Sequence, residues 1–302
     1  MAMRLRRSEL ATPASNVQMI QRAAASAADL LFLDLEDSVV PALKAEARDN
    51  AARALTELDW GNKTRAVRVN GAATPWAHED VITILERAGR CLDVIIIPKV
   101  KAPRDVWFFD TLLGQLETKL GLPRPIGIEA LIEETEALTC VEEIAGCSPR
   151  LEALILGVGD LAASQGVRLR HLLDPADRYP GDLWHYARNR MVVAARARGL
   201  DAIDGPYFNF ADTEGYHHEA AWSATLGCVG KWAIHPSQID AANEVFAPTE
   251  AEIEFARQMC SAYESGASAG AGASGTRGIM VDAASVRIFK AVLERARLTG
   301  RG

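Results

Sequence analysis

Short apolar runs of strand length alternate with longer segments of helical periodicity along most of the 302-residue chain, and this alternation constrains the fold more than any other feature. The runs are rich in Val, Ile and Leu, and several are unbroken, as strands are when both of their faces are buried. The predicted strands are residues 7–11, 30–36, 64–70, 93–100, 126–132, 151–158, 200–205 and 229–236.

The segments between these runs carry apolar residues at helical spacing, and several end at Gly, which commonly follows a helix. The clearest predicted helices are residues 41–58, 78–89, 134–146, 182–199 and 212–227. Alternation of strand and helix favours right-handed winding into a parallel sheet, and eight such strands close a barrel. We therefore predict a (β/α)8 TIM barrel, with an open doubly wound sheet as the alternative.

The composition changes near the C-terminus. Residues 265–278, SGASAGAGASGTRG, are too small to bury a core, which is typical of a flexible linker. A helical pattern resumes beyond them. We predict a barrel domain over residues 1–264, a linker over 265–278, and a C-terminal helix over 279–302 that acts as a lid or docks on a neighbouring subunit. The alternative is a terminal helix packed on its own barrel.

Charge and cysteine content narrow the classes of partner. The formal net charge is −7, so we expect neither nucleic acid nor an anionic membrane as a partner. No apolar stretch approaches the ~20 residues that cross a bilayer, and the opening MAMRLRRSEL is not a signal sequence. The five cysteines are odd in number and contain no CxxC pair, and we predict a cytoplasmic protein.

Polar and charged side chains stand at the ends of the predicted strands, where the loops of a TIM barrel build its active site. One such residue alone is more often a loop or turn residue, but their convergence on one face favours a site. They are Glu36 and Asp37 after the second strand, Arg68 and Asn70 after the third, Lys99 after the fourth, Glu133 after the fifth, Asp160 after the sixth, Asp204 after the seventh and His235 after the eighth.

Glu133 and Asp160 form the most specific pair. Adjacent barrel strands bring them together, and Gly157 and Gly159 allow a tight turn before Asp160. Two oxygen ligands without a cluster of His or Cys suit a hard cation that keeps some of its waters, so we predict Mg2+, with Mn2+ as the alternative ion. The other role open to Glu133 is that of a helix-start residue, because acidic groups favour a helix N-terminus.

Seven motifs occur in order along nearly the whole chain: LDLEDSV, VRVNG, IPKV, IEALIE, GVGDLAAS, GKWAIHP and MVDAAS. Together they resemble the HpcH/HpaI aldolase and citrate lyase β-subunit (CitE-like) superfamily, and most closely its malyl-CoA and β-methylmalyl-CoA lyase branch. The resemblance implies a Mg2+-dependent TIM-barrel lyase that cleaves or forms a carbon–carbon bond beside a CoA thioester.

The resemblance also implies roles for individual residues. Glu133 and Asp160 match the metal ligands of the family, Arg68 matches the arginine that holds the keto-acid portion, and Asp282 matches an aspartate in the C-terminal segment. Because family members place that segment over a neighbouring subunit's site, Asp282 is expected to transfer a proton there, and a homotrimer or homohexamer is implied.

The remaining strand-end residues are expected to bind substrate, or to contact and orient the residues that bind the metal and the substrate. Glu36 and Asp37 are expected to orient Arg68 or metal-bound water. The other residues in this group are Asn70, Lys99, Asp204 and His235.

One position departs from the pattern of the family. Asn16 stands where many members carry an arginine after the first strand, so a positive charge near the mouth of the site is missing. The nearby Arg4, Arg6 and Arg7 either compensate by binding CoA phosphates or form a solvated tail. This departure affects the expected affinity for CoA, and it leaves Arg68 untouched.

The expected substrate is a short 3-hydroxyacyl-CoA such as malyl-, β-methylmalyl- or citramalyl-CoA, which yields an acyl-CoA and glyoxylate or pyruvate. Three alternatives stay open. They are a malyl-CoA thioesterase, a protein like the citrate lyase β-subunit, and a non-catalytic paralogue that retains the barrel.

Overall fold

The computed structural model describes residues 4–168, 181–268, 273–276 and 279–301. Contacts within the chain group these residues into two compact units, which are described separately. The larger unit comprises Arg6–Asn243, and the smaller one comprises residues 4 and 5 together with the chain from Glu244 onward.

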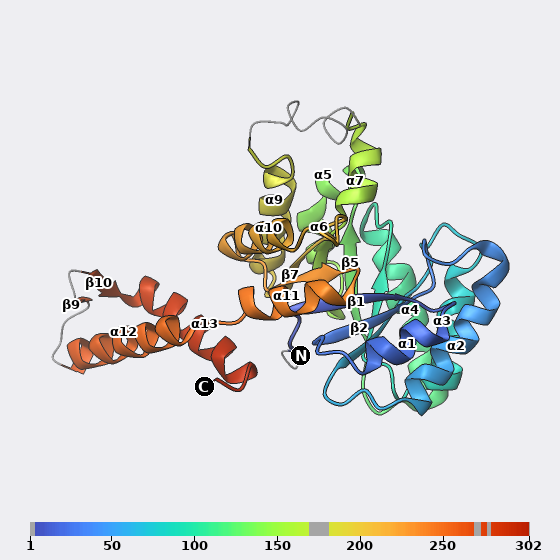
Figure 1. Ribbon diagram of the computed structural model, residues 1–302, viewed down its shortest axis with the longest axis horizontal. Coiled ribbons are helices and arrows are strands. Elements are labelled where there is room, and N and C mark those ends of the chain that lie inside the picture. Colours follow the sequence, from blue (N-terminus) through green and yellow to red (C-terminus); the bar gives the residue numbers. More distant parts are fainter. Residues whose placement is uncertain (1–3, 169–180, 269–272, 277–278, 302) are drawn as a thin grey trace. The chain divides into compact units, whose positions relative to one another are not determined.

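Eight parallel strands of the larger unit form a closed barrel in the order of the sequence, so the predicted (β/α)8 TIM barrel is confirmed (Figure 1). The barrel closes where β1 pairs with β8. Each predicted strand corresponds to an observed one, with ends that differ by a few residues. The strands are β1 (Ser8–Pro13), β2 (Leu30–Asp34), β3 (Thr64–Arg68), β4 (Val94–Ile97), β5 (Gly127–Ile132), β6 (Leu151–Leu156), β7 (Asp201–Asp204) and β8 (Gly230–Ala233).

Helices follow the strands, as the alternating pattern predicts. The single helix predicted over 134–146 is instead two short helices, because the backbone at Cys140 leaves the helical region with φ −125° and ψ 27°. The described helices of this part are α1 (Val17–Ala24), α2 (Lys44–Glu57), α3 (Ala77–Ala88), α4 (Pro103–Leu120), α5 (Thr135–Thr139), α6 (Val141–Ala145), α7 (Val158–Gln165), α9 (His185–Ala197), α10 (Thr213–Leu226) and α11 (Ile239–Val245), with single 3-10 turns at Pro41–Leu43 and Pro236–Gln238.

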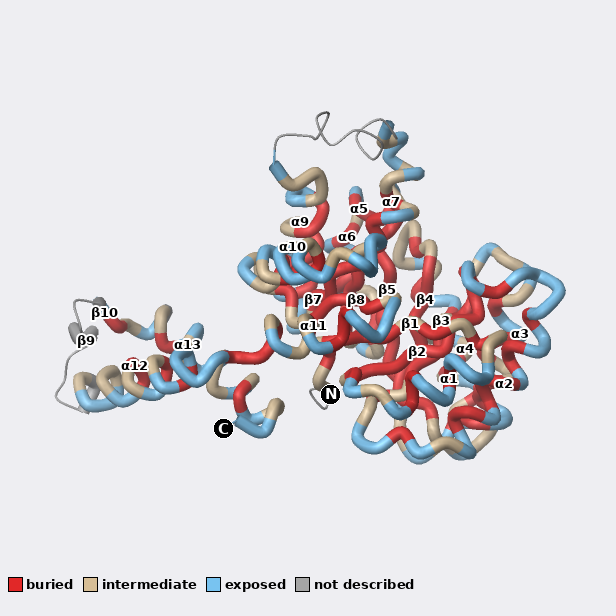
Figure 2. Tube along the Cα trace, viewed as in Figure 1, coloured by how far each residue is buried: buried red, intermediate tan, exposed pale blue. Residues whose placement is uncertain are grey.

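The barrel interior is filled by alternate residues of the strands, and most strand residues are buried (Figure 2). Successive side chains of a strand point to opposite faces, so every second residue faces inward. The inward cluster is Leu30, Phe32, Ala66, Val94, Ile96, Leu131, Ala153, Ile155, Ile203 and Trp232. This alternation determines which strand-end side chains point along the barrel axis and which point toward the surrounding helices.

The smaller unit contains α12 (Glu250–Ser268), β9 (Ala273–Thr276), β10 (Ile279–Asp282) and α13 (Ala283–Leu298). Strands β9 and β10 pair antiparallel, and Met259, Val281 and Val286 contribute to a small apolar core. The predicted boundaries differ here. The predicted linker 265–278 overlaps the end of α12 and the whole of β9, and the predicted helix 279–302 begins with a strand; residues 269–272 and 277–278 lie outside the described residues.

Among the described residues, we find no helix that is both long enough and apolar enough to cross a membrane.

Candidate active site

A cavity of about 360 Å³ lies at the carboxyl end of the barrel. Its walls include the last residues of β1, β2 and β3, which are Pro13, Asp34 and Arg68, and residues that follow β5 and β6. Loops at the carboxyl ends of strands form the active site of TIM-barrel enzymes. This cavity is therefore the candidate active site.

Arg68 ends β3 in register with Asp34 at the end of β2. Its Nε and Nη2 each donate to one Asp34 oxygen at 2.7 Å, and its Nη1 lies 3.2 Å from Glu36 Oε2. Burial alone lowers the pKa of Arg68, but the carboxylates around it raise that pKa overall, so the guanidinium stays charged. Arg68 also lines the cavity, where its remaining N–H groups can bind a carboxylate.

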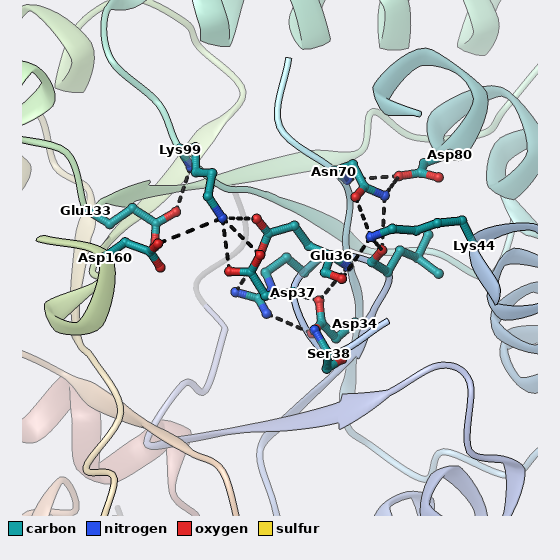
Figure 3. Close-up of polar contacts among 12 residues, drawn as sticks. Asp34, Glu36, Asp37, Ser38, Lys44, Asn70, Asp80, Lys99, Glu133 and Asp160 are labelled. Atoms are coloured by element: carbon teal, nitrogen blue, oxygen red, sulfur yellow. Dashed lines mark hydrogen bonds and ion pairs between the residues drawn. The ribbon is translucent and has the colours of Figure 1, made fainter. Parts of the chain in front are cut away.

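Lys99 connects the acidic stretch after β2 with the opposite wall (Figure 3). Its Nζ donates to Glu36 Oε1, lies 2.9 Å from Asp37 Oδ2, and lies 3.9 Å from Asp160 Oδ1. Its backbone has φ 52°, a left-handed conformation that residues other than glycine rarely adopt. In this conformation its N–H donates to Glu133 Oε1 at 2.7 Å. A residue with a strained backbone therefore contacts carboxylates from three loops.

Glu133 follows β5 and is 2% exposed, whereas Asp160 lies in the first turn of α7 with a side chain that is 42% exposed. Figure 3 shows the two carboxylates side by side. Burial raises the pKa of Glu133 to about 8, and the negative charge of Asp160 adds to this rise, against the opposing N–H bond from Lys99. Gly157 makes this approach feasible, because a Cβ there would lie 2.5 Å from Glu133 Oε2.

The two carboxylates fit a hard divalent cation. No group of three or more His, Cys, Asp and Glu side chains in the described part of the chain could hold a metal ion. Mg2+ does not need such a group, because it commonly binds one or two carboxylates and fills its other positions with water and substrate oxygens. A buried carboxylate beside a second one is also stabilised by a cation. Glu133 and Asp160 are the residues that would hold Mg2+.

Asn70 is buried and does not line the cavity. Its Oδ1 accepts a hydrogen bond from Lys44 Nζ at 2.7 Å, and its Nδ2 donates to Asp80 Oδ2 at 2.6 Å. Lys44 also donates to the backbone carbonyls of Leu35 and Glu36. The expected role of Asn70 next to the substrate therefore has no support in its contacts, which instead fix the loop that carries Glu36 (Figure 3).

Asp204 and His235 are also placed differently from the expectation. Asp204 is fully buried, where its carboxylate accepts hydrogen bonds from Arg188 Nε at 2.9 Å and Lys231 Nζ at 2.7 Å. His235 stacks on Phe210 and bonds to its neighbour Ser237, which is the geometry of a corner at the end of β8. Neither side chain lines the cavity.

Arg6 and Arg7 do not replace the cation that is missing at Asn16. Arg6 is buried, with its Nε 2.8 Å from Glu129 Oε1, and Arg7 pairs with Asp29 at 2.7 Å. Both precede β1 and so lie at the amino end of the barrel, away from the cavity. Both predicted roles, a solvated tail and a CoA phosphate site, are wrong for Arg6. Asn16 instead caps α1 by accepting a hydrogen bond from the Met19 N–H.

Asp282 belongs to the smaller unit, at the end of β10. Its carboxylate caps α13, because Oδ1 accepts hydrogen bonds from the backbone N–H and the hydroxyl of Ser285, each at 2.9 Å. Its role in proton transfer over a neighbouring subunit's site stays a prediction.

Asp34 and Trp232 both line the cavity and contact Arg68, and neither was among the site residues predicted from the sequence. Asp34 could have been found, because it ends β2 in register with Arg68 and the two opposite charges therefore meet at the same rim. Trp232 reads as an ordinary core residue in the run GKWAIHP, and nothing in the spacing of that run marks it.

Comparison with known proteins agrees with this geometry. The model of the family described as HpcH/HpaI aldolase/citrate lyase matches residues 7–236. An L-malyl-CoA/beta-methylmalyl-CoA lyase from Cereibacter sphaeroides (strain ATCC 17029) is 42% identical over 301 residues, which cover 97% of this chain and 95% of that protein. A (3S)-malyl-CoA thioesterase from Cereibacter sphaeroides (strain ATCC 17025) is 34% identical over 290 residues, which cover 96% and 94%.

A solved structure extends the comparison to ligands. The crystal structure of CitE from Mycobacterium tuberculosis in complex with magnesium, acetoacetate and coenzyme A superposes with a TM-score of 0.75 at 28% identity, and covers 96% of this chain and 97% of that one. The sequence and the fold thus agree on one family. The chain belongs to the HpcH/HpaI aldolase/citrate lyase family.

Proposed function

We propose that this protein is a Mg2+-dependent carbon–carbon lyase that acts on a short 3-hydroxyacyl-CoA such as malyl-, β-methylmalyl- or citramalyl-CoA. The products are an acyl-CoA and glyoxylate or pyruvate, and the reaction can run in either direction. One observation carries the proposal: the pair Glu133 and Asp160 faces the same cavity as Arg68. The near full-length similarity to a malyl-CoA/methylmalyl-CoA lyase supports it.

The residue types suit this cleavage. Breaking the bond between the acyl group and the hydroxyl-bearing carbon requires loss of the hydroxyl proton, departure of an enolate, and protonation of that enolate. Glu133 and Asp160 would hold Mg2+, which would supply Lewis-acid polarisation of the substrate oxygens. Arg68 binds the carboxylate of the keto-acid portion through N–H groups that Asp34 does not use, in a planar geometry that lysine does not provide.

The acidic stretch after β2 supports these groups. Glu36 contacts both Arg68 and Lys99, and Asp37 contacts Lys99, so the two carboxylates hold the cations in place. Asp282 is our candidate for protonation of the acyl carbon. We propose that it reaches the site from a neighbouring subunit of a homotrimer or homohexamer, in a protein of the cytoplasm.

A thioesterase is the second candidate, and the 34% identity to a malyl-CoA thioesterase over almost the whole chain favours it. In that reaction water attacks the thioester carbonyl, and CoA leaves as a free thiol with malate intact. The same cavity and the same cation would serve both reactions.

One assay separates the two. The purified protein is incubated with Mg2+ and malyl-, β-methylmalyl- or citramalyl-CoA, and keto acid and free thiol are followed together. We expect keto acid and acyl-CoA to form in equal amounts. Release of thiol without keto acid would establish the thioesterase, and absence of both products with all three substrates would support the non-catalytic paralogue. Replacing Mg2+ by Mn2+ tests the second ion.

A further inference from the structure

The Arg68 guanidinium contacts the ring of Trp232, a residue that has no role in the proposed reaction. Asp34 holds the Nε and Nη2 edge of Arg68, which fixes the guanidinium within the plane of that carboxylate but leaves it able to tilt about the paired edge. The guanidinium also lies over the Trp232 ring, with Arg68 Cζ 5.5 Å from the ring centroid. A cation over an indole face is attracted by the ring and also blocked by it. Glu36 Oε2 lies 3.2 Å from Nη1 and limits this tilt from one side, and Trp232 limits it further through the ring.

Trp232 is itself held from the barrel interior. Its Nε1 donates to Glu9 Oε2 at 2.9 Å, and its ring lies 4.6 Å from the ring of Phe32. Trp232 is 4% exposed and Glu9 is 0% exposed. The indole therefore has little room to rotate, and a continuous set of contacts runs from Glu9 through Trp232 to the cavity wall.

Burial of the Glu9 carboxylate in the barrel interior costs free energy that packing alone does not offset. Glu9 stands in the second position of β1, inside a barrel whose other layers are largely apolar, and its Oε1 has no hydrogen-bond partner among the described residues. Burying a polar atom without a partner costs free energy, and an apolar side chain of similar size would avoid that cost. Among the described residues, the one side-chain hydrogen bond of Glu9 comes from Trp232, so besides the attraction of the nearby Arg6, orientation of the indole is what this carboxylate provides.

We propose that Trp232, held by Glu9, is a positioning residue that sets the tilt of the Arg68 guanidinium toward the substrate's carboxylate. The proposal rests on the proposed function only in that Arg68 binds this carboxylate. It extends the site from its rim down to the middle of the barrel, and it assigns a role to the tryptophan of GKWAIHP.

Two pairs of variants separate the contributions. Trp232→Phe keeps an aromatic face but removes the N–H that Glu9 holds, whereas Trp232→Leu removes the face as well. Glu9→Gln keeps an oxygen that can accept from the indole, whereas Glu9→Met removes it. Burial and the nearby Glu129 raise the pKa of Glu9 against the opposing effects of Arg6 and the Trp232 hydrogen bond, and the amide of Gln matches the size and shape of this side chain.

The probe is oxalate, a small dicarboxylate that resembles the keto acid, bound to the Mg2+-loaded protein and measured by titration calorimetry. We expect Trp232→Leu to weaken oxalate binding about tenfold, with Trp232→Phe and Glu9→Met in between. Glu9→Gln restores binding to near the wild-type value. The affinity for Mg2+ alone stays unchanged in all four variants, because Glu133 and Asp160 are untouched. In the lyase assay the same order appears in the KM for glyoxylate more than in kcat.

Trp60→Phe is the matched control. Trp60 is also buried, and its Nε1 donates to the Ala54 carbonyl at 2.9 Å, but it does not line the cavity. This control should lose similar stability and bind oxalate normally. Oxalate affinity that is the same in wild type, Trp232→Leu and Glu9→Met overturns the inference even if the protein is an active lyase. A wild type without lyase activity whose oxalate binding still follows the expected order overturns the proposed function alone. If Trp232→Leu does not fold, the other three variants decide.

Discussion

Two charged clusters stand at the same rim of the barrel, and they differ in which way they point. At β2 and β3, Asp34 pairs with Arg68 against the cavity. At β7 and β8, Asp204 pairs with Lys231 and Arg188, and all three side chains are fully buried. Both clusters consist of a strand-end carboxylate with basic partners. Charge at the end of a strand therefore does not by itself indicate a functional residue.

The alternation of side chains along each strand explains the difference. Phe32 and Ala66 face inward, so Asp34 and Arg68, each two residues later, face the same way and end at the cavity. Ile203 faces inward, so Asp204, one residue later, points outward and meets Arg188 of α9. A shift of one position thus separates a residue that can bind substrate from one that joins the barrel to its helices.

The largest effect is expected when the two carboxylates of the cavity, Glu133 and Asp160, are replaced by amides. We expect Glu133→Gln and Asp160→Asn each to lower Mg2+-dependent turnover by about a thousandfold, because loss of a cation ligand removes several kcal/mol of stabilisation. Burial already disfavours the charged form of Glu133, whose pKa is raised to about 8, so Glu133→Gln should unfold at the same temperature as wild type or higher. Steady-state assays and thermal unfolding measure both effects, and normal turnover in either variant would remove the metal assignment.

The next largest effect is expected at Asp282, in the smaller unit. Asp282→Asn keeps an N-cap for α13, since Asn and Asp cap helices about equally well, but it removes the carboxylate that we propose transfers a proton. We expect kcat to fall about a hundredfold with unchanged Mg2+ affinity. A chain cut near residue 270 should keep a folded barrel and lose most activity. Full activity in either protein would contradict the predicted lid role.

The buried cluster of Asp204, Lys231 and Arg188 should affect stability rather than turnover. Asp204→Asn leaves Lys231 and Arg188 buried without their shared carboxylate, and we expect it to lower the free energy of unfolding by about 3 kcal/mol. The kcat of the folded fraction should stay within about twofold of wild type, because Asp204 does not line the cavity. Urea unfolding and assays of the soluble fraction measure the two quantities. A selective loss of kcat would restore Asp204 to the site.

The same carboxylate predicts a pH dependence. Burial alone would raise the pKa of Asp204, but Lys231 and Arg188 outweigh burial and lower it below its ordinary value of 3.8. The stability that this group contributes is therefore present above pH 3.8 and is lost as the pH falls through the lower folded value. Between pH 5 and pH 3, wild type should lose more unfolding free energy than Asp204→Asn. Equal losses would show that the pair does not titrate as described.

The barrel could be predicted from the sequence because the pattern of strand followed by helix occurs eight times. An error in one strand boundary therefore does not change the predicted topology. The position of Glu133, Asp160 and Arg68 at the cavity could also be predicted, since each follows an apolar run by one or two residues, whereas their roles in binding and catalysis stay predictions. Whether a side chain at the end of a strand points into the barrel or toward the helices could not be predicted from the sequence. The strands are buried on both faces, so their apolar runs lack the alternation that would have separated Asp204 from Arg68.

The supporting contacts were hidden for another reason, since they join residues far apart in the sequence. Lys44 donates to Asn70 across 26 positions, and Arg6 donates to Glu129 across 123 positions. The linker prediction rested on composition, which cannot show that Ala273–Thr276 pairs with another strand. Composition describes a tendency of the free segment, whereas pairing depends on the segment that meets it.

The smallest expected effect concerns the backbone that joins the two walls of the cavity. Lys99 adopts φ 52°, which costs a residue with a side chain about 1 kcal/mol and costs glycine almost nothing. Lys99→Gly and Lys99→Met both remove the ammonium near Asp160, so both should bind Mg2+ about threefold more tightly. Only Lys99→Gly relieves the backbone, and it should therefore be about 1 kcal/mol more stable than Lys99→Met in urea unfolding. Equal stabilities would mean that the backbone here carries no strain, and unchanged Mg2+ affinity would mean that Lys99 does not act on Asp160. The second result would confine the role of Lys99 to Glu36 and Asp37, and the pair Glu133 and Asp160 would then act independently of the acidic stretch after β2.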